Sequence, residues 1–194
     1  MNLDSEIIVV SGLPRSGTSL MMQMLDAGGI QIVTDRVRTA DVDNPRGYFE
    51  FEQAKQVQND PSWLPETRGK ALKMVSQLLY HLPQTERYRI IFMRRNLEEM
   101  LISQEKMLRR RNAPTAPRDQ IKEAYTLHLE TLVQWLLRQA NMKVLIVNYN
   151  DLLDDPRTLA EKVREFLDGR PAVKAMTQAV EPDLYRNRNI ASEA

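Results

Sequence analysis

The sequence predicts one α/β domain over residues 1–194, with a four- to five-stranded parallel sheet flanked by helices in a three-layer fold. Short apolar runs alternate along the chain with longer segments of helical periodicity. Strands that alternate with helices form parallel βαβ units, and helices then cover both faces of the sheet. A chain of 194 residues can bury one sizeable core, and no repeat or low-complexity segment indicates a second domain.

Apolar runs mark the expected strands. They lie at residues 7–10, 72–75, 89–93 and 143–147, with a weaker candidate at 30–33. The longest helical pattern covers residues 118–141, where Ile, Tyr and Leu recur at the spacing of a packed crossover helix. His128 lies within this pattern, and we expect it to be an ordinary helix residue.

The first strand leads into a loop typical of phosphate binding, in the segment IIVVSGLPRSGTSLMMQML. The spacing from Gly12 to Gly17 fits G-x-x-x-x-G-K-[ST], except that Thr18 stands at the lysine position. Free backbone N–H groups and the helix dipole at such a loop favour an anion. In nucleoside-triphosphate enzymes, a lysine at this position contacts the β- and γ-phosphates. Because the nearest cation here is Arg15, we predict a P-loop-like fold that binds its anion without the loop lysine. The alternative is a tight strand-to-helix turn that binds no ligand.

A second strand-to-helix junction, RIIFMRRNLEEMLISQEKML, has arginines between the strand and the helix. Asn96 is the expected N-cap, and Glu99 follows three residues later, as in a capping box. The helix should therefore begin just after Arg95. Ser103 lies two turns into that helix, so Arg95 and Ser103 can share a face and hold one phosphate group.

A third junction, KVLIVNYNDLLDDPRTLAEKVREFLD, again has a strand, a turn and a helix. Asp155 is the expected N-cap, with Pro156 at the first helical position. In open α/β sheets, ligands bind beyond the carboxyl ends of the strands. We therefore expect Arg15, Arg95 and Tyr149 to meet at that edge of the sheet.

These three segments, in this order, resemble those of the sulfotransferases that use 3′-phosphoadenosine 5′-phosphosulfate (PAPS), and the chain is similar to a small bacterial-type member. The resemblance implies a 5′-phosphosulfate loop at the first junction, a 3′-phosphate motif at the second, and a tyrosine near the adenine at the third. The donor-binding residues that it implies are Arg15, Ser16, Gly17, Thr18, Ser19, Arg95, Ser103 and Tyr149. Asn150 departs from the family segment, which has Glu there.

Many cytosolic members close over the 3′-phosphate with a glycine-rich loop near the C-terminus, and this chain has no counterpart of that loop. Either Arg186 and Arg188 in LYRNRN substitute for it, or the donor site is more open. A solvated tail is the other interpretation of these arginines.

Sulfuryl transfer displaces less charge than phosphoryl transfer, so fixed cations and amides can replace Mg²⁺, and we expect no metal. A cation on the bridging oxygen and a general base for the acceptor are still needed. We expect Arg15 to supply the cation with Lys73 assisting, because family members carry a lysine near that strand end. The Lys-Thr-His pattern of some members is absent, since Met74 and Val75 follow Lys73.

The predicted general base is Glu50 in NPRGYFE, which resembles the early-loop glutamate of other sulfotransferases. A carboxylate needs desolvation to raise its pKa toward neutrality. Helix capping is the structural alternative for this residue. The other candidate bases are Glu52, Asp43 and His81.

Composition narrows the other classes of function. The chain has no cysteine, which excludes disulfides, thiol nucleophiles and thiolate zinc sites. A net charge of +1 argues against attraction of the whole protein to nucleic acid or membrane. The N-terminal apolar run has only four residues and no basic region before it. We therefore expect no signal peptide or membrane insertion and a cytoplasmic enzyme.

The predicted reaction transfers a sulfuryl group from PAPS to a hydroxyl or amine of a small-molecule or glycan acceptor. One alternative is a degenerate P-loop kinase or NTPase, which would bind ATP with Mg²⁺. Another is a non-catalytic nucleotide-binding protein that keeps the donor site and lacks the base. Apolar side chains on the helix at 97–108 leave a homodimer open.

Overall fold

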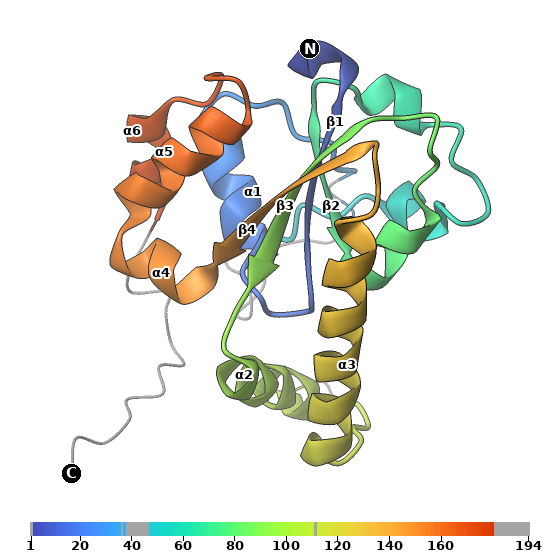
Figure 1. Cartoon of the computed structure of the whole chain (residues 1–194). Coiled ribbons are helices and arrows are strands. Elements are labelled where there is room, and N and C mark those ends of the chain that lie inside the picture. The colour runs from blue at the N-terminus through green and yellow to red at the C-terminus, as the bar shows by residue number, and fades with distance from the viewer. Residues whose placement is uncertain (1, 36, 38–46, 111, 181–194) are drawn as a thin grey trace.

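The computed structural model describes residues 2–35, 37, 47–110 and 112–180. Figure 1 shows the arrangement of its strands, its α-helices and its short 3-10 helices, which are labelled η. In chain order these elements are η1 (Leu3–Ser5), β1 (Ile7–Gly12), α1 (Thr18–Ala27), η2 (Glu52–Gln56), η3 (Leu64–Thr67), β2 (Ala71–Val75), η4 (Ser76–His81), β3 (Tyr88–Arg94), α2 (Leu97–Arg110), α3 (Arg118–Leu136), β4 (Met142–Asn148), α4 (Tyr149–Asp154), α5 (Pro156–Phe166) and α6 (Val173–Gln178).

A four-stranded parallel sheet in the order β2-β1-β3-β4 forms the middle layer of the described chain. The α/β fold with a parallel sheet flanked by helices is thereby confirmed. The weaker strand candidate at 30–33 contributes an isolated bridge, in which Ile32 pairs with Ala71. Because all four strands run in one direction, their carboxyl ends lie at one edge, the lower edge of the sheet in Figure 1.

The central strand β1 is buried on both faces, as its unbroken apolar sequence indicates. Ile8 and Val10 face a core cluster that includes residues of α1, α4, α5 and α6. Ile7 and Val9 face a second cluster that includes residues of η2, η3, η4 and α3. Figure 1 shows these two groups of helices on opposite sides of the sheet.

The predicted helix starts are confirmed. Asn96 Oδ1 accepts hydrogen bonds from the amides of Glu98 (2.9 Å) and Glu99 (3.3 Å) at the start of α2. Asp155 caps α5 by accepting from the amide of Thr158, and Pro156 is the first residue of that helix. Helix α3 ends at Leu136 and is shorter than the pattern at 118–141, because the chain turns there to enter β4.

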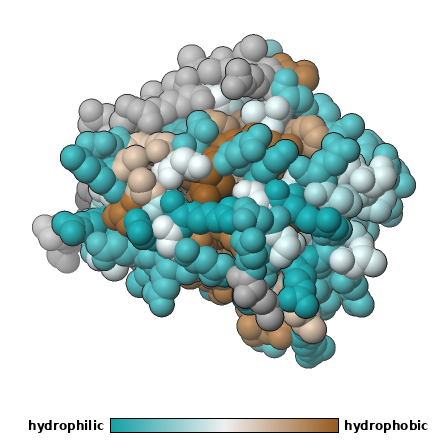
Figure 2. All heavy atoms as spheres, turned by 90° about the horizontal axis from the view of Figure 1, so that it is seen from above, coloured by the Kyte–Doolittle hydropathy of each residue, from teal (hydrophilic) through white to brown (hydrophobic). Residues whose placement is uncertain are grey.

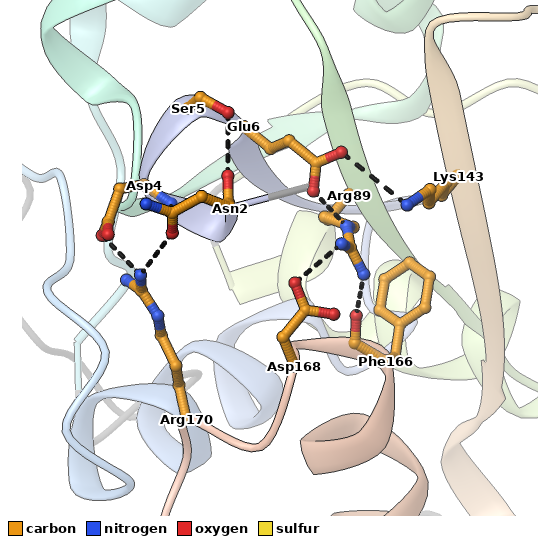
Figure 3. A network of polar contacts seen from close by, with 9 residues as sticks. All are labelled: Asn2, Asp4, Ser5, Glu6, Arg89, Lys143, Phe166, Asp168 and Arg170. Carbon is orange, nitrogen blue, oxygen red and sulfur yellow. Dashed lines mark hydrogen bonds and ion pairs between the residues drawn. The ribbon is translucent and has the colours of Figure 1, made fainter.

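A buried polar network closes the amino edge of the sheet (Figure 3). Arg89 on β3 donates to the carboxylate of Glu6, to the carbonyl oxygen of Phe166 (2.5 Å) and to the carboxylate of Asp168 (2.9 Å).

Figure 2, seen from above Figure 1, shows mainly hydrophilic side chains around a narrow hydrophobic strip on this side of the molecule. Within the described ranges, no helix is long and apolar enough to cross a membrane.

Candidate functional site

The loop between β1 and α1 packs closely against two neighbouring segments. Gly17, the N-cap of α1, has a φ of 98°, and no side chain caps the helix. A Cβ on Gly17 would lie 2.2 Å from Cδ2 of Tyr149, and a Cβ on Gly12 would lie 2.6 Å from the carbonyl oxygen of Met93. Glycine is therefore required at both ends of the loop. The uncapped amides of α1 lie at the carboxyl edge of the sheet, where they can bind an anion.

The loop also contains a buried hydroxyl that needs a hydrogen-bond partner. Ser16 is 2% exposed, and its Oγ has no partner among the described residues. The Oγ of Ser11, at the end of β1, is in the same situation. Burying a hydroxyl without a hydrogen bond is unfavourable. The Ser16 hydroxyl and the α1 amides therefore fit an anionic ligand at this loop, and Thr18 and Ser19 begin the helix beside it.

Arg15 connects the loop to the second junction. Its backbone has a φ of 68°, and its Nε donates to Oγ of Ser103 on α2 at 3.1 Å. Its carbonyl oxygen accepts from Nη1 of Arg95 at 3.4 Å. Arg95 and Ser103, the two residues of the predicted 3′-phosphate motif, therefore both contact Arg15 in the predicted 5′-phosphosulfate loop.

Tyr149 joins the third junction to the first two. Its ring packs against Gly17, and the guanidinium carbon of Arg95 lies 4.6 Å from the ring centroid. Burial raises the pKa of the Tyr149 hydroxyl above its usual value, and the cations of Arg95 and Arg15 oppose this shift only in part. The phenol is therefore neutral near pH 7. Arg15, Arg95 and Tyr149 meet at the carboxyl edge, as expected.

A buried acid lies in the cluster of Arg15, Arg95 and Tyr149, and the sequence did not indicate it as part of this cluster. Glu99, assigned from sequence to a capping box, lies 3.3 Å from Nε of Arg95 through its Oε2. Asn150 Nδ2 lies 3.4 Å from each carboxylate oxygen of Glu99. The spacing of four residues between Arg95 and Glu99 on a helix start was the signal for their ion pair, whereas nothing in the sequence linked Asn150 to Glu99.

Glu50 and Lys73 form a second cluster, beside strand β2. The Lys73 ammonium lies 4.0 Å from Oε1 of Glu50 and donates to the carbonyl oxygen of Tyr48. Lys55 approaches the other carboxylate oxygen of Glu50 at 3.3 Å. The side chains of Lys73 and Glu50 are 13% and 19% exposed, so the structure brings the predicted base and the assisting cation together in a mostly desolvated position.

The other candidate bases are exposed or lie outside the described residues. The Glu52 side chain is 52% exposed and pairs with Lys55, and His81 is exposed at the end of η4. Asp43 lies outside the described residues, as do Arg186 and Arg188.

The sulfotransferase domain model matches residues 5–183, a range that contains all three junctions and both clusters. The chain belongs to the sulfotransferase family. This confirms the family identified from the motifs, that of the PAPS-dependent sulfotransferases. Two candidate donor-site residues, Arg186 and Arg188, lie beyond the match.

Solved sulfotransferases have the same fold at low sequence identity. Mouse sulfotransferase SULT7A1 complexed with PAP has a TM-score of 0.55 and 16% identity over 92% of this chain and 63% of that chain. The sulfotransferase domain from the curacin biosynthetic pathway has a TM-score of 0.54 and 13% identity over 95% of this chain and 80% of that one. A sulfotransferase from Alicyclobacillus acidocaldarius has a TM-score of 0.50 and 16% identity over 92% of this chain and 87% of that one.

This sulfotransferase chain therefore spans less than two thirds of the length of the mouse protein. No curated protein matches its sequence. The comparisons establish its family and its fold.

Proposed function

We propose that this protein transfers a sulfuryl group from PAPS to a hydroxyl or amine of a small-molecule or glycan acceptor. The observation that carries the proposal is the meeting of the two phosphate motifs at Arg15, which contacts both Ser103 and Arg95. PAPS bears a 5′-phosphosulfate and a 3′-phosphate. A site that joins one anion-binding motif to another suits a ligand with both groups. The proposal also includes the expected cytoplasmic location and leaves a homodimer open.

In this proposal, each end of the donor has its own residues. The α1 amides, the Ser16 hydroxyl and Arg15 hold the 5′-phosphosulfate, while Arg95 and Ser103 hold the 3′-phosphate. Tyr149 supports the loop through Gly17 and lies near the adenine. Arg186 remains a proposed donor contact. Thr18 in place of the loop lysine is consistent with donor binding without Mg²⁺.

The reaction requires the acceptor atom to bond to sulfur as the bond between sulfur and the phosphate oxygen breaks. Glu50 accepts the proton that the acceptor loses. Arg15 offsets the negative charge that develops on the phosphate oxygen, and Lys73 assists. The ammonium of Lys73 lies 4.0 Å from Oε1 of Glu50, which places the proposed assisting cation beside the proposed base.

Calorimetric titration with 3′-phosphoadenosine 5′-phosphate tests the donor class. The titrations include ATP with and without Mg²⁺, and compare wild type with Arg95→Ala. Arg109→Ala is the matched control, because it removes an exposed arginine near the C-terminal end of α2, the helix that Arg95 precedes. We expect metal-independent binding of the bisphosphate at micromolar concentration, lost in Arg95→Ala and kept in Arg109→Ala.

Two other outcomes would redirect the proposal. ATP binding that requires Mg²⁺, without binding of the bisphosphate, would overturn it in favour of a degenerate kinase or NTPase. Bisphosphate binding without transfer from PAPS to any acceptor in a broad panel would favour a non-catalytic nucleotide-binding protein.

A further inference from the structure

Glu99 is a buried acid within a cluster of cations. It is 4% exposed, and its carboxylate contacts both Arg95 and Asn150. Arg95 precedes α2 and Asn150 belongs to α4, so this carboxylate connects the second and third junctions. Burying a carboxylate is unfavourable unless it is paired and hydrogen-bonded, and these two contacts satisfy that requirement.

The charge of Glu99 works against the proposed phosphate site. A carboxylate beside a phosphate-binding arginine repels the phosphate, and this repulsion is strong where water is excluded. If charge were its only contribution, Glu99 would weaken the binding of any ligand that carries a phosphate here. A benefit from this residue must therefore come from geometry.

That geometry concerns the orientation of Arg95. Its Nε is 3.3 Å from Glu99, its Nη1 is 3.4 Å from the carbonyl oxygen of Arg15, and its guanidinium stacks 4.6 Å from the centroid of the Tyr149 ring. A guanidinium is planar and has five N–H donors, so these contacts are compatible with a phosphate bound to the same group. Three neighbours from three different segments set the plane of this arginine.

Building on the proposed function, we propose that Glu99 and Asn150 are positioning residues of the donor site. Glu99 orients Arg95 toward the 3′-phosphate, and Asn150 holds the Glu99 carboxylate in place through both of its oxygens. The pair thereby makes the site selective for nucleotides that carry a 3′-phosphate. Neither residue has to contact the nucleotide.

The test measures the affinity for 3′-phosphoadenosine 5′-phosphate and for AMP, which lacks the 3′-phosphate, in wild type, Glu99→Gln and Asn150→Ala. Positioning predicts that Glu99→Gln weakens binding of the bisphosphate by about tenfold, because the neutral amide oxygen of Gln accepts a weaker hydrogen bond from Arg95 and holds the plane of its guanidinium less firmly. The affinity for AMP should change by less than about twofold. Asn150→Ala should also lower the affinity for the bisphosphate relative to that for AMP, by a smaller factor.

Glu98→Gln is the matched control, since it removes the same charge from the neighbouring position, where Glu98 pairs with Lys122. Equal or tighter binding of the bisphosphate by Glu99→Gln, whatever the change for AMP, would overturn the inference, since removal of repulsion alone predicts tighter binding of the bisphosphate and little change for AMP. Failure of wild type to bind the bisphosphate would instead overturn the proposed function. Thermal unfolding identifies a misfolded Glu99→Gln, in which case Asn150→Ala decides the question.

Discussion

Nε of Arg15 donates to Oγ of Ser103 at 3.1 Å, although 88 positions separate the two residues in the chain. The bond runs from the loop after β1 to the second turn of α2. It ties the proposed phosphosulfate loop to the proposed 3′-phosphate motif. The cation of Arg15 is therefore oriented by a residue of the other motif.

Ser103→Ala should weaken binding of 3′-phosphoadenosine 5′-phosphate by about tenfold, since it removes a hydroxyl proposed to bind the 3′-phosphate and removes the hydrogen-bond acceptor of the Arg15 side chain. Stability should change little, because alanine favours the helix by about 0.5 kcal/mol and offsets part of the lost hydrogen bond. Calorimetry and thermal unfolding measure the two effects separately. Thr126→Ala removes a hydroxyl that bonds within α3 and should leave affinity unchanged.

Gly17→Ala should destabilise the fold by about 3 kcal/mol, from the left-handed backbone and the overlap with Tyr149. Gly29 is the matched control, with a φ of 90° and no atom within 4 Å of the position that a Cβ would occupy. Gly29→Ala should cost only about 1 kcal/mol, from the backbone alone. Urea unfolding compares them, and equal losses would show that the contact between Tyr149 and Gly17 is not tight.

Glu50→Gln should abolish sulfuryl transfer and leave donor affinity intact, because it removes the proposed base and keeps the shape of the side chain. Glu52→Gln makes the same charge change two residues away on a 52% exposed side chain and should keep its turnover. Steady-state assays with an acceptor found by screening, together with calorimetry on the donor product, measure both quantities. Unchanged turnover in Glu50→Gln would remove this residue from the mechanism.

Arg89→Ala should destabilise the protein by about 4 kcal/mol, because it leaves the buried carboxylate of Glu6 without its arginine. Nucleotide affinity should be unaffected in the folded fraction, since Glu6 and Arg89 lie at the amino ends of β1 and β3, at the opposite edge of the sheet from the site. Arg170→Ala breaks the more exposed pair with Asp4 in the same region and should barely change stability. Chemical denaturation measures all three proteins.

His128 should make stability depend on pH in the acidic range. Its Nε2 lies 2.9 Å from Oγ of Ser76, and burial lowers the pKa of its imidazole below the usual 6.5. The unfolded chain binds this proton first, so the stabilisation is present above the unfolded pKa and is lost as the pH falls through the folded pKa. Between about pH 7.5 and about pH 5, His128→Gln should lose less stability than wild type. His81→Gln, at an exposed histidine, should follow the wild-type profile.

Local patterns in the sequence were sufficient for the strands, the loop and the helix starts. An unbroken apolar run such as Ile7 to Val10 is buried on both faces, and Asn96 and Asp155 cap the helices that follow them. These features depend on neighbours within a few residues. The three motifs, read in order, were also sufficient to identify the family.

Contacts between distant segments depended on the tertiary structure. The order β2-β1-β3-β4 brings β1 beside β3, and this neighbourhood lets Arg15 reach Ser103. No local pattern encodes that order. The ion pair of Arg95 with Glu99 could be anticipated from helical spacing, whereas the contact of Glu99 with Asn150 requires α2 and α4 to meet.

The sequence by itself determined the fold class, the family and the residue types that can bind phosphate, since these follow from periodicity, capping and motif spacing. Only the tertiary structure decided which of those residues orient one another. It placed Glu50 beside Lys73 and Tyr149 against Gly17. The physical reason is that burial and pairing, which set the charge and the orientation of a side chain, are properties of packed neighbours that lie far apart in the chain.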